Sequence, residues 1–201
     1  MPGRVLTDRR QQIIDAAFHV FSRKGFTGAT NRDIASQAKI APGLIYWYFR
    51  TKEDLLQATA EAKSPLFPLI RLTDEMLDAP PRQFFHRVAS LFLERVYGDP
   101  QITAAARFLF AEAMRYRPIR KLFRERIIVR GLDAIARYIR VQIDRGTIRP
   151  IHPMVGARLF MGMLMSQILL GRLLELGLPV TPERLAVDLV ETYLEGVLAK
   201  E

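Results

Sequence analysis

The stretch that decides the fold runs from residue 41 to residue 56 and reads APGLIYWYFRTKEDLL. Four aromatic side chains, Tyr46, Trp47, Tyr48 and Phe49, follow one another directly after a Pro-Gly pair. Neighbouring residues of a helix diverge by about 100°, so a short helix cannot turn all four rings toward one core. The sequence therefore predicts that some of these rings face outward.

The residues around this stretch predict short helices with very short connections. Thr30 and Thr51 each precede a predicted helix, and each is followed three residues later by an aspartate, Asp33 or Asp54. A hydroxyl at the N-cap with a carboxylate three positions on is a variant of the capping box. Pro42 suits the first position of the helix between them. This helix, short turn and second helix match a helix-turn-helix, whose second helix enters the major groove of DNA.

The predicted second helix has an inner and an outer side. Ile45 and Phe49 lie four residues apart and are expected to face the core, which leaves Leu44, Trp47 and Tyr48 on the other side. Tyrosine hydroxyls donate to phosphates, and ring faces contact sugars and thymine methyl groups. The alternative is a short amphipathic helix with its rings half-buried against the next helix. That alternative leaves the local charge unexplained.

Positive charge is concentrated at the start of the chain. Residues 1–52 carry nine lysines and arginines against three aspartates, a net +6 of the total +9. The other 149 residues carry 21 basic against 18 acidic groups, a net +3. A basic first quarter indicates an anionic polymer or membrane as partner, although charge alone does not define a fold.

The residues that would support catalysis are missing or isolated. The chain of 201 residues has no cysteine, which excludes disulfides, thiolate metal sites and cysteine nucleophiles. His19, His86 and His152 stand alone, without a second ligand at metal-binding spacing. There is no glycine-rich phosphate loop and no nucleophile elbow. We therefore expect no enzyme, no cofactor and no metal site.

The compartment is predicted from two segments. The N-terminus, MPGRVLTDRRQQ, has no apolar core of a secretion signal. The most apolar stretch, LFMGMLMSQILLG at 159–171, has 13 residues, whereas a membrane-spanning helix needs about 20. The sequence predicts a cytoplasmic protein with no membrane partner.

Helical periodicity runs through the whole chain, and no segment has a convincing strand pattern. Proline and glycine mark the helix ends, and Pro65 and Pro68 should break the helix that starts at Lys52. We predict an all-α protein with a helix-turn-helix domain at 1–52 and a larger helical domain at 53–201. The longer helices are expected at 7–24, 81–97, 100–115, 118–145, 153–176 and 182–199.

The segment from Arg10 to Leu56 resembles the DNA-binding region of the TetR family of bacterial repressors. The family pattern occurs in order and spacing in the blocks Ala17–Phe26, Thr30–Ala35, Gly43–Phe49 and Lys52–Leu55. The resemblance implies that a set of residues in this region faces DNA. These residues are Thr30, Asn31, Pro42, Gly43, Leu44, Tyr46, Trp47, Tyr48 and Lys52.

Three positions depart from the family pattern. Lys39 stands in a turn where the family usually has glycine, and Ala41 stands where it usually has serine or threonine. The loss of that cap costs about 1 kcal/mol. Leu44 replaces a residue that is commonly small or polar. We hypothesise that Pro42, Leu44 and Trp47 form an apolar surface that reads thymine methyl groups.

The resemblance also implies that the C-terminal helices bind a ligand and form a dimer. For the ligand pocket we predict apolar residues together with two polar ones in apolar surroundings, which need partners. They are Phe67, Phe92, Phe108, Glu112, Met161, Met165 and Gln167. For the dimer contact we predict residues of the two last helices, which would form a four-helix bundle with a second copy. They are Leu164, Ile168, Gly171, Leu189 and Leu194.

The sequence thus predicts a ligand-responsive regulator, a repressor in the first instance, with three partners: double-stranded operator DNA, a small apolar effector and a second copy of itself. A twofold dimer places two recognition helices about 34–36 Å apart, which requires a near-palindromic operator. The alternative is a basic helical protein that binds a membrane surface or a protein partner without sequence-specific DNA binding.

Overall fold

The computed structural model of the protein describes residues 2–197, with side chains from Arg9 to Gly196. The regular elements of this part of the chain are all helices, and no β-strand occurs in it, as the sequence predicts. The predicted end of the last helix, at residue 199, lies outside the described residues.

The chain forms two compact units. The N-terminal unit contains the residues up to Ser64 together with Ala104–Arg126, and the C-terminal unit contains Pro65–Thr103 and the residues from Ile127 onward. The unit with the helix-turn-helix therefore extends through the fourth helix and takes in a later segment. The predicted division at residue 52 stays a prediction about function.

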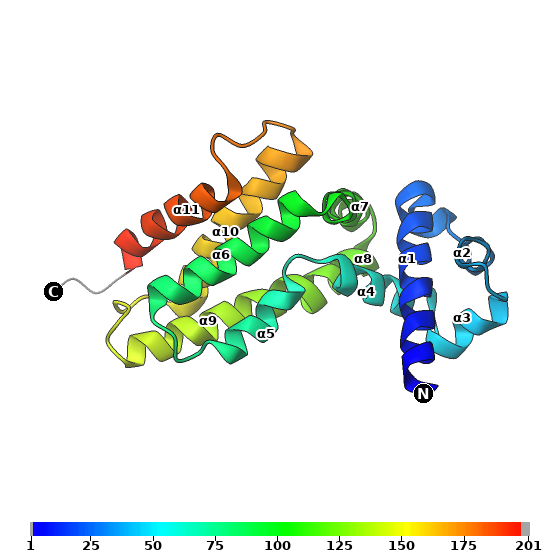
Figure 1. Cartoon of the computed structure of the whole chain (residues 1–201), viewed down its shortest axis with the longest axis horizontal. Helices are drawn as coiled ribbons and strands as arrows, with labels where there is room; N and C mark the ends of the chain where they lie inside the picture. Colours follow the sequence, from blue (N-terminus) through cyan, green and yellow to red (C-terminus); the bar gives the residue numbers. More distant parts are fainter. Residues whose placement is uncertain (1, 198–201) are drawn as a thin grey trace. The chain divides into compact units, whose positions relative to one another are not determined.

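The N-terminal unit is built on α1, and Figure 1 shows α2 and α3 on the same side of this helix. At Gly25 the backbone of α1 leaves the helical region, with φ 70° and ψ 170°, a conformation that suits glycine. The elements are α1 (Pro2–Gly28), α2 (Asn31–Ala38), α3 (Pro42–Tyr48), α4 (Lys52–Lys63), most of α7 (Pro100–Arg115), α8 (Arg117–Phe123) and the start of the π-helical turn η1 (Arg124–Ile128).

Both predicted capping boxes are confirmed. The Asp33 N–H donates to Thr30 Oγ1 at 3.1 Å, and the Asp54 N–H donates to Thr51 Oγ1 at 3.0 Å. In each case the aspartate accepts the N–H of the capping threonine in return. Helix α3 begins at Pro42, also as predicted, and Ala41 supplies no side-chain cap.

The core of the N-terminal unit joins the first four helices to the later segment. The predicted inward residues of α3, Ile45 and Phe49, are 1% and 5% exposed. Ile119 of α8 is buried in the same cluster, and Phe108 of α7 packs against it with its ring stacked on Phe21 at 6.1 Å. The other buried members include Ile13, Ile14, Ala17, Ile34, Leu55 and Leu56.

The C-terminal unit has longer helices. Figure 1 shows α6 running between α11 and the pair α5 and α9. Two predicted helices differ, because π-helical segments interrupt or end them: η1 precedes α9, and η2 ends at Leu173 rather than at residue 176. The elements are α5 (Phe67–Glu75), α6 (Pro81–Gly98), α9 (Val129–Asp144), α10 (Pro153–Ser166), η2 (Gln167–Leu173) and α11 (Pro182–Val197).

Aromatic rings fill the core of the C-terminal unit. Phe85 is fully buried, and its ring centroid lies 4.7 Å from Phe160, 4.9 Å from Tyr193 and 5.6 Å from Tyr138. The Tyr138 hydroxyl donates to the Ala79 carbonyl oxygen at 2.7 Å, which ties α9 to the turn before α6. Burial raises the pKa of Tyr138, so this hydroxyl stays a hydrogen-bond donor at neutral pH.

Candidate nucleic-acid interface

The start of α2 is fixed by hydrogen bonds around Thr30. Its N–H and its hydroxyl both donate to Asp33 Oδ2, at 3.0 and 2.8 Å, and Lys24 Nζ donates to the other carboxylate oxygen at 2.7 Å. The hydrogen bond from Lys24, followed by those from Thr30, lowers the pKa of Asp33 to about 2. Thr30 therefore serves as the helix cap, and the N–H groups of Asn31 and Arg32 are left without an intrahelical acceptor.

Helix α3 exposes large rings to solvent. Tyr46 is 60% and Trp47 is 70% exposed, and the Trp47 ring meets Tyr48 edge-on at 5.0 Å. Tyr48 and Leu44 are half-buried, so Tyr46 is more exposed than the predicted outer residues Leu44 and Tyr48. A Cβ added at Gly43 would have no other atom within 4 Å, so the surface at the start of α3 is open.

Lys52, at the start of α4, is half-buried, and its ammonium group donates hydrogen bonds to backbone carbonyl groups of its own chain. Its Nζ donates to the carbonyl oxygens of Phe26 at 2.9 Å and Ala29 at 3.0 Å. The same nitrogen lies 4.5 Å from the centroid of the Phe26 ring. An ammonium group has three N–H donors, so Lys52 clamps the connection between α1 and α2 and keeps one donor for another acceptor.

Four cationic residues of this surface were not among those predicted to face DNA. Arg10, Arg32, Lys39 and Arg50 are all exposed, and the Arg10 guanidinium lies 5.2 Å from the Phe49 ring centroid. The excess of positive charge in residues 1–52 was the available signal, but charge counts do not say which cations share a face. Arg32 follows the α2 cap directly, and Arg50 follows α3.

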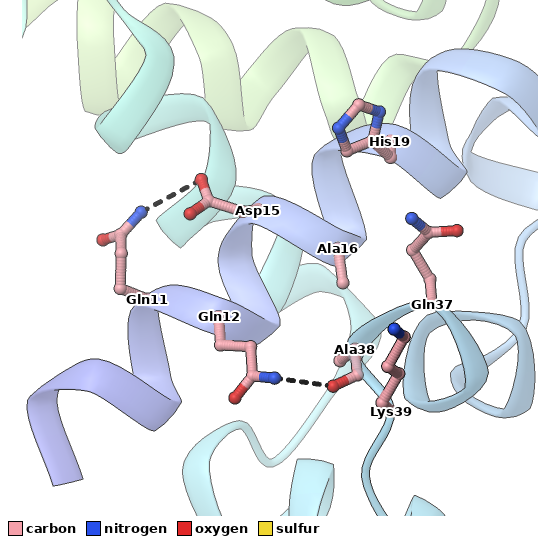
Figure 2. A pocket seen from close by; sticks show the side chains of 8 residues that line it. All are labelled: Gln11, Gln12, Asp15, Ala16, His19, Gln37, Ala38 and Lys39. Carbon is pink, nitrogen blue, oxygen red and sulfur yellow. Dashed lines mark hydrogen bonds between the residues drawn. The ribbon is translucent and has the colours of Figure 1, made fainter. Parts of the chain in front are cut away.

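A hollow of about 540 Å³ opens where α1 meets the end of α2 (Figure 2). Gln12 Nε2 donates to the Ala38 carbonyl oxygen at 2.7 Å, and Gln11 Nε2 donates to Asp15 Oδ1 at 3.2 Å. The bond from Gln12 holds α1 against the end of α2, whereas the bond from Gln11 stays within α1. The hollow is lined by Gln11, Gln12, Asp15, Ala16, His19, Gln37, Ala38 and Lys39, none of them predicted to bind a ligand.

The predicted ligand-pocket residues are divided between the two units. Phe67, Phe92, Met161, Met165 and Gln167 belong to the C-terminal unit. Phe92 and Met161 are buried in its core, whereas Phe67 is half-buried beneath the Arg130 guanidinium at 5.5 Å. The role of these five residues as a pocket stays a prediction.

The two others, Phe108 and Glu112, belong to the N-terminal unit. Glu112 was predicted to line the pocket because a buried carboxylate needs a partner, and that reason does not hold. Its Oε2 accepts the Phe26 N–H at 3.3 Å. Gln167 is likewise partnered, since its side-chain nitrogen donates to Ser166 Oγ at 3.0 Å.

Three of the five residues predicted for the dimer contact are buried within their own chain. Leu164, Ile168 and Leu194 are 0%, 4% and 1% exposed, so they pack inside their own chain and offer no surface to another copy. Gly171 is buried against the Tyr97 hydroxyl, and Leu189 is half-buried. A helix that is apolar on all sides does not say which side is inner. The exposed large apolar residues of α10, η2 and α11 are Val155, Leu159, Leu169, Leu170 and Val187.

The segment formed by α10 and η2, Pro153–Leu173, is long and apolar enough to cross a membrane by length and composition. It has 21 residues and a mean hydropathy of 1.4, so the 13-residue limit inferred from the sequence was too short. One such helix is weak support for a membrane protein, because the core helix of a water-soluble protein passes the same test.

Capped short helices, outward rings and surrounding cations define a helix-turn-helix of the DNA-binding type. Residues 13–59 match the family of bacterial regulatory proteins called the tetR family, and residues 72–198 match the C-terminal domain of AefR-like transcriptional repressors. The chain therefore belongs to the TetR family of transcriptional regulators. This membership supports the regulator over the alternative of a basic helical protein without sequence-specific DNA binding.

Relatives with known roles match part of the chain. The nicotine-responsive transcriptional repressor HdnoR of Paenarthrobacter nicotinovorans is 38% identical over 94 residues, which cover 46% of this chain and 47% of that protein. The regulator BetI of Paraburkholderia phytofirmans is 32% identical over 117 residues, 57% of this chain and 59% of that protein. The matched region spans less than two thirds of either relative.

Solved structures share the fold at low identity. FadR from Bacillus subtilis, in complex with stearoyl-CoA, superposes with a TM-score of 0.74 at 22% identity, covering 92% of this chain and 98% of that one. The complex of SmeT from Stenotrophomonas maltophilia with triclosan gives 0.75 at 21% identity, covering 96% and 93%. These similarities establish the arrangement of helices.

Proposed function

We propose that the protein is a cytoplasmic transcriptional repressor that binds a near-palindromic DNA operator as a homodimer and is released from it by a small apolar molecule. The observation that carries the proposal is the outward placement of Tyr46 and Trp47, 60% and 70% exposed, on the second helix of a capped helix-turn-helix. Large exposed rings gathered on a helix of seven residues indicate a surface that a binding partner covers.

The reading surface contacts bases from α3. Pro42, Leu44 and Trp47 supply the apolar groups, and thymine methyl groups are the apolar feature of the major groove. Tyr46 and Tyr48 supply hydroxyls that donate to phosphates. The open space at Gly43 lets the DNA backbone approach the start of the helix.

Phosphate contacts come from the ends of the neighbouring helices. The Asn31 and Arg32 N–H groups at the start of α2 meet one phosphate, because helix starts attract anions. The remaining donor of Lys52 meets a second, and the exposed guanidiniums of Arg32 and Arg50 add charge. Thr30 contributes as the cap that fixes this helix start.

The dimer forms through the exposed apolar side of α10 and η2. Leu159 of α10 is 58% and Leu169 of η2 is 51% exposed, whereas the inner residue Leu164 is fully buried. A Leu159→Glu variant is expected to be monomeric in light scattering and to keep its helical circular dichroism. A Leu164→Ala variant is the matched control, expected to lose about 2–5 kcal/mol of unfolding free energy without becoming monomeric. A fully dimeric Leu159→Glu protein would refute this interface.

The effector is expected to be apolar. The names and titles of similar proteins mention nicotine, stearoyl-CoA and triclosan, each of which has a large apolar part. An effector releases the operator when it binds more tightly to the conformation of the dimer that does not fit DNA.

The decisive experiment uses Trp47, the only tryptophan of the chain. Its fluorescence is followed while the protein is titrated with the DNA upstream of its own gene and with a scrambled sequence, at several salt concentrations. We expect saturation at two chains per site, preference for the native DNA and steep weakening with salt. An equal response to both DNAs, or none, would refute specific regulation by α3, and liposome flotation would then test for membrane binding.

The thymine reading is tested separately on the bound site. Uracil in place of thymine removes the methyl group and leaves the base pair intact. Each methyl group that α3 contacts is expected to cost about 1 kcal/mol of binding free energy when removed. Unchanged affinity after every such replacement would refute the apolar reading surface while leaving DNA binding in place.

A further inference from the structure

The segment from Gly25, where α1 kinks, to Ala29 forms the connection between the regular part of α1 and α2, and two charged side chains hold it. The DNA-reading surface uses one of them, Lys52, and does not account for the other, Glu112. Glu112 Oε2, from α7, accepts the Phe26 N–H at 3.3 Å. Lys52 Nζ, from α4, donates to the Phe26 carbonyl oxygen at 2.9 Å. A carboxylate and an ammonium group thus bind the two consecutive peptide groups that flank Phe26.

Glu112 is built into this place. It is 8% exposed, although a carboxylate is rarely buried without a strong partner. Gly25 adjoins it in a left-handed backbone conformation, with φ 70°, and a Cβ on Gly25 would lie only 3.1 Å from Glu112 Oε1. The carboxylate therefore lies against a glycine, whose missing side chain leaves room for it.

The connection that Glu112 holds leads directly to the proposed phosphate site. Four residues lie between Gly25 and the cap Thr30, and the Ala29 carbonyl oxygen is the second acceptor of Lys52, at 3.0 Å. Displacement of Phe26 would move the start of α2 relative to the start of α4. Both helix starts must be placed together to meet the same DNA backbone.

We propose that Glu112 is a positioning residue for operator binding: through the Phe26 N–H it fixes the α1–α2 connection, and α7 thereby controls where the start of α2 lies. The proposal rests on the proposed DNA-binding function. The start of α7 is also held by a side chain from another element. There the Thr103 hydroxyl accepts a hydrogen bond from Arg172 Nε of η2 at 3.1 Å.

The test compares substitutions at Glu112 with the same substitutions at Glu125, an exposed glutamate of the same unit. Glu112→Met keeps the side-chain length and removes the acceptor, whereas Glu112→Gln keeps an acceptor and removes the charge. We expect operator affinity to fall about tenfold for Glu112→Met and at most about threefold for Glu112→Gln. Glu125→Met is expected to bind as the wild type or slightly more tightly.

Electrostatics alone predicts the opposite sign. Loss of a negative charge favours binding to DNA, so both methionine variants should bind more tightly if Glu112 acted only through its charge. Exchange of the Phe26 amide hydrogen, followed by NMR in the free protein, gives the second reading. It should accelerate about tenfold in Glu112→Met and stay slow in Glu125→Met.

The outcomes separate this proposal from the function on which it rests. A wild-type protein that binds no operator refutes the function itself. A folded Glu112→Met protein that binds as tightly as Glu125→Met overturns the positioning role. If Glu112→Met does not fold, Glu112→Gln decides. In Glu112→Gln, slow exchange of the Phe26 amide hydrogen together with operator binding supports the proposal. Slow exchange in that variant with operator binding lost overturns it.

Discussion

Two helices of each unit show different means of fixing a helix start. In the N-terminal unit, α2 and α4 each begin with a threonine that exchanges hydrogen bonds with an aspartate of its own first turn. In the C-terminal unit, α6 and α10 begin with proline and have no side-chain cap. The turn before α6 is instead held from a distant helix, by Tyr138 and by Gln142 Nε2 donating to the Leu77 carbonyl oxygen at 3.1 Å.

This comparison separates the features that neighbouring residues specify from those that depend on distant residues. A cap needs two residues three positions apart, so sequence spacing alone specifies it. A helix that is placed by contacts with distant residues can be recognised from its periodicity, but its inner side cannot. Substitutions in both units test whether the C-terminal core depends on distant contacts as strongly as α2 and α4 depend on their local caps.

The largest effect is expected for Phe85→Ala in the C-terminal core. Phe85 is fully buried, and its ring packs against Phe84 and Phe160. Truncation of a buried phenylalanine costs about 3–5 kcal/mol of unfolding free energy. Urea unfolding followed by circular dichroism measures it. Met114→Ala, at a side chain that is 72% exposed, is the control and should change the free energy by less than about 0.5 kcal/mol. Equal losses for the two variants would refute the aromatic core.

Gly171→Ala should have the next largest effect. A Cβ at Gly171 would overlap the Tyr97 hydroxyl, which donates to the Gln167 carbonyl oxygen at 3.0 Å. We expect a loss of about 1–3 kcal/mol of unfolding free energy, as for other overpacked sites. Thermal unfolding measures it at a protein concentration that keeps the oligomeric state constant.

Tyr97→Phe provides the matched test of the cause. Alone, it removes one hydrogen bond and should cost about 1 kcal/mol. Combined with Gly171→Ala it should recover part of the loss, because the overlapping oxygen is gone. Strict additivity of the two changes would mean that Gly171 makes its close contact elsewhere, as the original dimer prediction supposed.

Sequence reasoning succeeded where the signal was local. It placed the starts of α2, α3 and α4 and the inner pair Ile45 and Phe49, because caps, prolines and helical spacing lie within a few residues. It also foresaw the helix break before Pro65. The family pattern then named the DNA-facing positions, which stay predictions.

Sequence reasoning failed where the partner was distant. Nothing near Glu112 announces that its carboxylate meets an N–H 86 residues away. The apolar helix α10 gives no periodicity by which Leu159 and Leu164 could be assigned to opposite sides. Lys52 was assigned to phosphate because it starts a helix, while two of its donors serve Phe26 and Ala29.

Removal of a cap tests the local side of the comparison. Thr51→Ala should cost about 1 kcal/mol of unfolding free energy, and Thr51→Ser should restore most of it.

In α2 the cap also depends on pH. The pKa of Asp33 is lowered from its ordinary 3.8 to about 2, so the unfolded chain binds the proton first as pH falls.

The sign follows from linkage. A carboxyl group with a lowered pKa in the folded state stabilises the fold above its unfolded pKa, and this stabilisation is lost as pH falls from about 4 toward about 2. Asp33→Asn should therefore flatten the fall of stability in that window, when unfolding is followed between pH 5 and 2. An unchanged pH dependence would mean that Asp33 is not held by Lys24 and Thr30 in solution.

The smallest effects are expected at two matched positions, one in each unit. Lys39 and Glu175 are the non-glycine residues with positive φ in the described part of the chain, 53° and 57°. The left-handed conformation costs an ordinary residue about 1–2 kcal/mol, and glycine recovers this less its own entropic cost of about 0.5–1 kcal/mol. Lys39→Gly and Glu175→Gly should each stabilise by about 0.5 kcal/mol.

Alanine at the same positions separates the backbone from the side chain. Lys39→Ala and Glu175→Ala remove the charge and the contacts of the side chain but keep the unfavourable φ, so neither should gain stability. If Lys39→Gly is more stable and yet binds operator more weakly, as Lys39→Ala also should, the lysine is retained for its charge near DNA at a cost in stability. If only Glu175→Gly gains stability, contacts of the Lys39 side chain stabilise the turn after α2 by more than its positive φ costs. Neighbouring residues would then not be sufficient to specify this turn of the N-terminal unit.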